Sequence, residues 1–316
     1  MLGFFYIRRI IGIVSSYNWF TLWVFIELNS LCFIPFILKI KTKKGGEASL
    51  LYFVTQGIRS IFLMFALIIE DSFIIIWNET NNIILLARLL KLRAGFFFNW
   101  IYILRFILTS SILFIVITLQ KIAPFLLLIF NQSTLRILII TFVLFSSLIG
   151  SIINLKQNKF KTIIRLSSLS NVSWFLIAAF ISVSNWIYYF FIYTLTIILI
   201  FIVNNYYLLQ NYKNKINKEN LLVFLRMGGL PPLPGFFPKL AILLLCVEHN
   251  LIFLSFFLVL LTCVDLYVYL QFRYSATLNY TRKRIYTKLP VSFAYMFSIL
   301  GLLRMFMINS MNMINI

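Results

Sequence analysis

Four charged side chains lie inside long apolar stretches of the sequence, where ionisable groups are rare. Glu27 follows Trp-Val-Phe-Ile, and the lysines Lys91, Lys121 and Lys239 lie in similarly apolar surroundings. In a helix that crosses a membrane, a charge near mid-depth costs at least about 2.5–3.5 kcal/mol on insertion scales. These residues are therefore candidates for a function that compensates for that cost.

Proton transfer is the chemistry that suits these residue types. Removal from water favours the neutral form of a lysine, whereas a neighbouring carboxylate favours its charged form. A lysine whose carboxylate partner is added or withdrawn therefore binds and releases a proton. One carboxylate and three lysines at one depth predict a proton relay across the bilayer. The alternative is that each is a structural ion pair or faces a neighbouring subunit.

Two segments beside these charges contain residues that interrupt helices. Residues 228–239 read Gly-Gly-Leu-Pro-Pro-Leu-Pro-Gly-Phe-Phe-Pro-Lys. The prolines remove backbone donors, and the glycines allow non-helical dihedral angles. Because non-helical backbone at membrane depth must be buried in protein or line a watery cavity, the segment predicts a discontinuous helix at Lys239. A loop between two helices is the alternative. Pro124, close to Lys121, gives a second proline signal.

The composition indicates that membrane helices position these residues. Of the 316 residues, 62% are hydrophobic and 11% are charged, whereas soluble domains have about 45–50% and about 25%. A membrane helix uses about 20 residues, and the short alternating segments of a β-barrel do not occur in the sequence. We therefore predict an all-α polytopic membrane protein with about eleven spans. The predicted spans are residues 3–18, 19–38, 49–69, 81–100, 101–130, 134–154, 160–183, 186–209, 221–248, 251–274 and 289–309.

The charges between the spans predict the orientation of the chain. The formal net charge is +20, but its basic residues lie between apolar runs, which argues for membrane topology and against nucleic-acid binding. Alternate loops form a basic set around residues 39–44, 156–161, 213–218 and 273–288. The intervening loops, around residues 70–79, 131–133, 184–185 and 248–249, contain no Lys or Arg. The basic loops and the N-terminus are thus predicted to face the inside, and the C-terminus the opposite side.

The order of the spans predicts an internal symmetry. Spans one to five cover residues 1–130 and spans six to ten cover 134–274, and the last span, 289–309, stands apart. Because five is odd, the second group enters the membrane from the opposite face, as in transporters with inverted repeats. Lys91 on the fourth span and Lys239 on the ninth then occupy equivalent places.

Residues 228–239 resemble the Gly-Gly-Leu-Pro-Pro-Leu-Thr-Gly-Phe-x-Pro-Lys signature of antiporter-like subunits in the membrane arm of respiratory complex I. Other stretches fit the family in order along nearly the whole chain. They are residues 19–35, 47–56, 90–92, 120–124, 167–174 and 267–270. The resemblance implies one integral membrane domain over residues 1–316, with eleven helices in two inverted five-helix units. It also implies a place in the mitochondrial inner membrane, with the basic loops toward the matrix and the C-terminus toward the intermembrane space.

The resemblance also implies roles for the intramembrane charges. Glu27 matches a glutamate that pairs with the lysine matched by Lys91, while Lys121 matches a central lysine and Lys239 the lysine on the second broken helix. In the family these residues form a water-linked proton path driven by quinone reduction elsewhere in the complex. The implied partners are other membrane-arm subunits, including neighbouring antiporter-like subunits, and lipids.

Three departures from the family pattern affect this expectation. Phe96 and Phe98 stand where the family has a helix-breaking Pro and a His, and Asn171 stands where many relatives have His. A relay through imidazole groups is therefore not expected at these points, and water would have to carry the proton. Arg88, one turn from Lys91, and Arg59, within the third span, are additional cations whose role the sequence does not explain.

The sequence contains no motif for redox chemistry. It has neither a Gly-x-Gly-x-x-Gly dinucleotide fingerprint nor a P-loop, and Cys32, Cys246 and Cys263 lack the spacing of an iron–sulfur site. The resemblance therefore implies that NADH, FMN, the iron–sulfur clusters and ubiquinone are bound by partner subunits. Two other functions stay open: an antiporter-like subunit of a cation/proton exchanger, and a structural membrane-arm subunit without a working pump.

Overall fold

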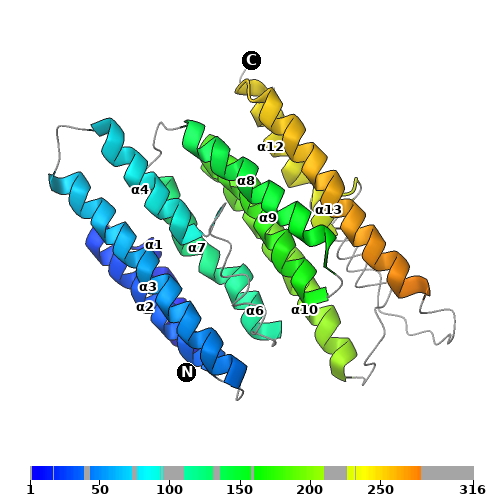
Figure 1. Ribbon diagram of the computed structural model, residues 1–316, viewed down its shortest axis with the longest axis horizontal. Coiled ribbons are helices and arrows are strands. Elements are labelled where there is room, and N and C mark those ends of the chain that lie inside the picture. The colour runs from blue at the N-terminus through cyan, green and yellow to red at the C-terminus, as the bar shows by residue number, and fades with distance from the viewer. Residues whose placement is uncertain are drawn as a thin grey trace. The chain divides into compact units, whose positions relative to one another are not determined.

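The structure is a computed structural model, which describes residues 2–16, 18–38, 43–72, 77–92, 94, 110–130, 136–157, 160–209, 226–231 and 233–278. Most of these residues lie in helices (Figure 1). In chain order the helices are α1 (Leu2–Val14), α2 (Trp19–Leu38), α3 (Lys43–Ser72), α4 (Trp77–Leu92), α6 (Ser110–Ile117), α7 (Leu119–Phe130), α8 (Arg136–Leu155), α9 (Phe160–Ile181), α10 (Val183–Leu209), α12 (Phe236–Glu248) and α13 (Ile252–Leu278).

Within the described residues, seven helical segments are long and apolar enough to cross a membrane. They are Phe20–Leu38, Gly45–Ile69, Ile112–Ile129, Ile137–Leu155, Lys161–Ile181, Val183–Ile202 and Ile252–Gln271. Large apolar side chains such as Ile61 and Phe65 on α3 are 69% and 58% exposed, as expected of a surface that faces lipid. The prediction of an all-α polytopic membrane protein is confirmed.

The helix boundaries differ from the predicted ones at three places that matter for the charged residues. α4 ends at Leu92, so Lys91 lies in the last turn of a helix, and residues 95–100 of the predicted span 81–100 lie outside the described residues. The predicted fifth span is interrupted at Thr118, between α6 and α7. α12 begins only at Phe236, so Lys239 lies in the first turn of a helix.

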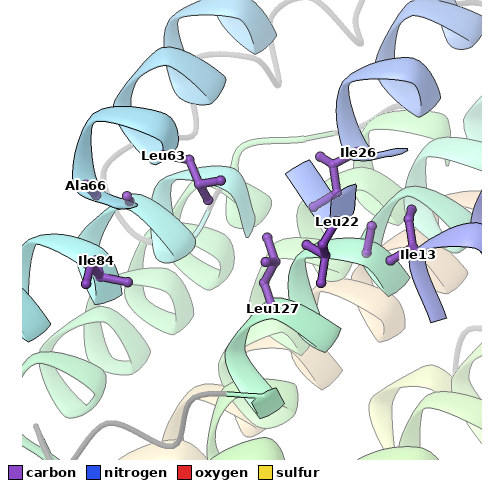
Figure 2. Close-up of a cluster of buried hydrophobic side chains, with 9 residues drawn as sticks. Ile13, Leu22, Ile26, Leu63, Ala66, Ile84 and Leu127 are labelled. Atoms are coloured by element: carbon purple, nitrogen blue, oxygen red, sulfur yellow. The ribbon is translucent and has the colours of Figure 1, made fainter. Parts of the chain in front are cut away.

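The chain divides into two compact units, residues 1–180 and 181–316. In the first unit α2 packs against α1 and α3, α3 against α4, and α7 against α1, α4 and α6. Apolar side chains from five helices meet in its core, as Figure 2 shows. They are Ile13, Leu22, Ile26, Leu63, Ala66, Ile84, Ala87, Ala123 and Leu127. This core holds α2, α4 and α7, the helices that carry three of the four predicted charged residues.

A second cluster in the first unit joins α2, α3 and α6. It consists of Phe33, Ile37, Ala48, Tyr52, Ile112 and Val116. The rings of Phe33 and Tyr52 lie 5.1 Å apart at a tilt of 59°, an arrangement favoured by the ring quadrupoles. Tyr52 is thus held by its ring among apolar neighbours, while its hydroxyl is available to polar groups.

The second unit contains α10, α12 and α13. α12 packs against both α10 and α13, and all three helices contribute buried side chains, including Tyr193, Ile242 and Leu258. The predicted C-terminal helix 289–309 lies outside the described residues, as do Phe96 and Phe98.

Candidate functional site

Glu27 and Lys91 form an ion pair in the first unit. Glu27 lies near the middle of α2, and its Oε1 is 2.8 Å from Nζ of Lys91 in the last turn of α4. The Lys91 side chain is 1% exposed and the Glu27 side chain 20%. The Ser30 hydroxyl donates a hydrogen bond to the Glu27 backbone carbonyl and lies 3.4 Å from its Oε2. The pair thus joins α2 and α4 through two residues that are 64 positions apart in the chain.

Lys91 lies in the last turn of α4, close to a second buried cation. The last carbonyls of an α-helix lack intrahelical partners and carry partial negative charge, so a cation in the final turn is stabilised. Arg88, one turn earlier on α4, is also buried, with 2% of its surface exposed. Arg88 borders a small recess whose other walls are apolar. They are Leu63, Ala66, Leu67, Ile84, Ala87 and Leu127. A second cation so close to Lys91 makes the carboxylate of Glu27 more important to the local charge balance.

Lys121 lies where α7 approaches α9. Its Nζ donates a hydrogen bond of 2.8 Å to the backbone carbonyl of Ser168 and lies 5.6 Å from the centre of the Phe175 ring. The interruption between α6 and α7 lies three residues before Lys121, at Thr118, whose hydroxyl donates to the carbonyl of Phe114. Lys121 is therefore held by a carbonyl dipole and a ring face.

A buried polar chain next to Lys121 was not foreseen from the sequence. The Gln120 amide donates to the hydroxyl of Tyr52 at 2.8 Å, and the Gln56 amide lies 3.4 Å from the same oxygen. Arg59 Nη1 lies 3.5 Å from Gln56 Oε1. Each of these side chains is at least 92% buried. The spacing of polar residues 52, 56 and 59 on one face of an otherwise apolar helix is the signal that could have revealed it.

Asn171 stands where many relatives have His, and its side chain forms a hydrogen bond within its own helix, α9. Its amide donates a hydrogen bond of 2.7 Å to the carbonyl of Ser167, and the residue is 4% exposed. The nearby hydroxyls of Ser167, Ser170 and Ser173 also donate to carbonyls one turn earlier on α9. This serine-rich turn satisfies its polar groups locally.

The proline segment interrupts the helix before Lys239, as the sequence predicted. Residues 226–228 are helical, Gly229 has a φ of 79°, and helix resumes at Phe236. A φ of this sign is readily adopted only by glycine. At Gly235 an added Cβ would lie 1.8 Å from the Arg226 carbonyl oxygen, so this position has room only for a hydrogen atom.

Lys239 donates hydrogen bonds to carbonyls that the interruption exposes. Its Nζ lies 3.0 Å from the carbonyl oxygen of Gly228 and 3.3 Å from that of Met227, and the residue is 91% buried. These carbonyls end a helical turn, where a cation is favoured. The break thus provides a polar site for a lysine within apolar surroundings.

The structure places the four predicted residues in three settings. Glu27 and Lys91 contact each other, Lys121 contacts α9 in the same unit, and Lys239 lies in the second unit. Among the residues that the structure describes, three further buried charges escaped the sequence analysis: Arg165, Arg226 and, in the middle of α13, Asp265, which is 7% exposed. The signal of Asp265 was the one used for the other four, a lone charge in an apolar span. In the described part of the chain, no three His, Cys, Asp or Glu side chains form a group that could hold a metal ion.

Comparison with known proteins identifies the family of this chain. Residues 16–108 and 77–264 match the membrane family described as NADH:quinone oxidoreductase/Mrp antiporter. The chain belongs to this family. It is 34% identical over 291 residues to "NADH-ubiquinone oxidoreductase chain 2" of Anopheles gambiae, covering 85% of this chain and 83% of that protein. The protein of the same name from Bos taurus is 31% identical over 289 residues, covering 85% and 82%.

Solved structures share the fold at much lower sequence identity. A chain of respiratory complex I from Thermus thermophilus superposes with a TM-score of 0.78 and 17% identity, covering 96% of this chain and 77% of that one. A chain of the Mrp complex from Dietzia sp. DQ12-45-1b gives a TM-score of 0.75 and 14% identity, covering 86% and 59%. The antiporter-like fold is therefore common to this chain and to both kinds of assembly.

Proposed function

We propose that this chain is a proton-translocating membrane-arm subunit of NADH:ubiquinone oxidoreductase, the respiratory complex I. Its family and its relatives at 34% and 31% identity, which carry the name of chain 2 of that enzyme, support the assignment. The observation that carries the mechanism is the 2.8 Å ion pair between Lys91 on α4 and Glu27 on α2, which is largely removed from water. The chain acts as one part of an enzyme complex and moves protons without carrying a redox centre.

The proposed relay runs through Glu27, Lys91, Lys121 and Lys239. While the Glu27 carboxylate is close, the ammonium form of Lys91 is favoured; when the two separate, the desolvated lysine releases its proton to water or to the next acceptor and becomes a neutral amine. Lys121 and Lys239 hold protons against backbone carbonyls, which stabilise a cation less than a full negative charge does. Quinone reduction elsewhere in the complex supplies the energy that separates and rejoins the pair.

The finer architecture belongs to this proposal. Two inverted five-helix repeats over residues 1–130 and 134–274, followed by a helix at 289–309, make eleven membrane helices within one domain. The basic loops and the N-terminus face the matrix of the mitochondrion, and the C-terminus faces the intermembrane space. The relatives of complex I and the positive charge of alternate loops support this placement.

Partner subunits provide what the chain lacks. Other membrane-arm subunits, including antiporter-like neighbours, surround it together with lipids, and NADH, FMN, the iron–sulfur clusters and ubiquinone are bound elsewhere in the complex. The family membership and the complex I structures with this fold support these assignments.

A cation/proton exchanger subunit is the second candidate, since the Mrp complex shares the fold. Purification of the native assembly separates the two. Recovery with subunits that contain flavin and iron–sulfur clusters supports the complex I assignment, and an assembly without them would refute it.

The relay is tested in the purified complex reconstituted into vesicles. Lys121→Ala and Lys239→Ala are expected to lower the number of protons moved for each NADH oxidised. Lys156→Ala, which removes an exposed lysine after α8, is the matched control and should leave the ratio unchanged. An unaltered ratio in both relay variants would disprove the proposed relay.

A further inference from the structure

Asp265 is a buried carboxylate that the proposed relay does not use. It lies in the middle of α13 and is 7% exposed. Among the acidic residues whose side chains the structure describes, Glu47 and Glu248 are exposed, Glu27 is partly buried, and Asp265 is the most buried. An ionised carboxylate in such a place is strongly unfavourable unless it has a charged or hydrogen-bonding partner.

Lys239 is a buried cation in the same unit as Asp265. α12, which carries Lys239, packs directly on α13, and Asp265 lies within electrostatic range of the lysine. Gly228, whose carbonyl accepts a hydrogen bond from Lys239, is pressed against α13 just after Asp265. A Cβ at Gly228 would lie 2.3 Å from Leu266 Cδ2 and 3.2 Å from Tyr269 Cδ2. The site that holds Lys239 therefore adjoins the turn of α13 that carries Asp265.

Three buried tyrosines lie on α10 and α13 in the same unit as this carboxylate. Tyr269 follows Asp265 by one turn on α13, and Tyr189 and Tyr193 are one turn apart on α10, the other helix that packs on α12. Each is at least 97% buried, and Tyr189 lies within electrostatic range of Tyr193, Tyr269 and Asp265. A phenol both donates and accepts a hydrogen bond, so it suits a path between an acid and an amine.

We propose that Asp265 is the proton-exchanging partner of Lys239, so that the second unit contains its own acid and base, as Glu27 and Lys91 do in the first. An ammonium has three N–H donors, which lets Lys239 keep its bonds to the two carbonyls while it interacts with a carboxylate. In the exchange, the Lys239 ammonium gives one proton to the Asp265 carboxylate, directly or through a tyrosine hydroxyl. The products are a neutral amine and a carboxylic acid, and the reverse step restores both charges. This inference rests on the proposed relay.

The test compares variants of the whole complex in vesicles. Asp265→Asn keeps the size of the side chain and removes the acid, and it is expected to lower proton-coupled ubiquinone reduction by at least about 10-fold, because general acid–base groups contribute that much or more. Asp265→Glu restores the acid and should stay within about 2-fold of the native rate. Glu248→Gln removes an exposed carboxylate at the end of α12 and serves as the control. Native rates in both Asp265 variants would overturn the proposal.

Infrared difference spectra provide a readout that a purely structural role would not change. The native complex should show a protonated carboxyl band during turnover that is lost in Asp265→Asn and kept in Glu248→Gln. A band that persists in Asp265→Asn contradicts the proposal. Lys239→Ala in the same preparation separates the two levels of the argument. If Lys239→Ala lowers proton transfer and Asp265→Asn does not, only this inference fails; if neither does, the relay itself fails.

If Asp265→Asn reduces the amount of assembled complex, that amount provides a second measurement. A buried lysine that has lost its carboxylate partner is strongly destabilising, so Lys239→Met combined with Asp265→Asn is expected to assemble better than Asp265→Asn alone. Losses that simply add in the double variant would show that the two residues do not interact and would overturn the pairing.

Discussion

Replacement of Glu27 by Gln is the most direct test of the ion pair in the first unit. The substitution keeps the shape of the side chain and its ability to accept a hydrogen bond, but it removes the negative charge that lies 2.8 Å from Lys91 Nζ. Lys91 is then left 99% buried with another cation, Arg88, one turn away. The variant should therefore shift Lys91 toward its neutral form.

The size of the effect follows from the geometry. At an effective dielectric constant of about 20, two unit charges separated by this distance attract by about 6 kcal/mol. Part of that is offset by desolvation and by water near Glu27, whose side chain is 20% exposed. Breaking a buried pair by removal of one partner costs about 3–5 kcal/mol, so we expect a loss of this order for the charged form of Lys91.

The assay measures proton uptake and NADH oxidation together in reconstituted vesicles. Glu27→Gln should lower both the rate of ubiquinone reduction and the protons moved per NADH. Glu47→Gln, at an exposed position on α3, removes the same charge without a buried partner and should behave as the native complex. The double variant Glu27→Gln with Lys91→Met removes both charges and should assemble better than Glu27→Gln alone, while it still fails to pump.

Two results would refute this reasoning. If Glu27→Gln pumps the native number of protons per NADH, the pair has no part in translocation. If the double variant assembles no better than Glu27→Gln, the carboxylate does not compensate the buried lysine, and the electrostatic account of the site is wrong.

Two further substitutions test the elements that hold the lysines. Gly235→Ala should destabilise the complex by at least about 1–3 kcal/mol, because the added Cβ would lie 1.8 Å from the Arg226 carbonyl oxygen. Gly57→Ala, which has open space around it, should be neutral or slightly stabilising. Thermal denaturation of the complex compares the two variants, and equal stabilities would contradict the packing argument. Tyr52→Phe removes the hydroxyl that accepts a hydrogen bond from Gln120 and should lower the free energy of unfolding by about 1–3 kcal/mol. Tyr267→Phe, at an exposed position, is the control. An unchanged melting temperature in Tyr52→Phe would show that the polar chain beside Lys121 contributes nothing to stability.

Much of the candidate site could be predicted because its signals are local. A glutamate or lysine within an apolar run is visible in any window of about 20 residues, which is how Glu27, Lys91, Lys121 and Lys239 were found. Prolines and glycines act on their own backbone, so the interruption before Lys239 also followed from residue types. Asp265 carried the same signal and was overlooked.

The places where helices end were harder to predict from hydropathy. Apolar stretches lie before Lys91 and after Arg93, so hydropathy alone extends the predicted span past the end of α4 and does not place Lys91 in a final turn. The same holds at Thr118, where α6 and α7 separate within a stretch that reads as one span. Hydropathy reports the cost of contact with lipid, whereas a helix end depends on which backbone groups find partners.

The sequence by itself determined the class of the molecule and several of the charges that are buried at a cost. Only the tertiary structure decided their partners. Glu27 contacts Lys91 across 64 residues of chain, Lys121 reaches the Ser168 carbonyl on α9, and Lys239 turns back to the Gly228 carbonyl. The physical reason is that composition and periodicity act over one helix, whereas the partner of a buried charge is set by which helices pack together and at what register.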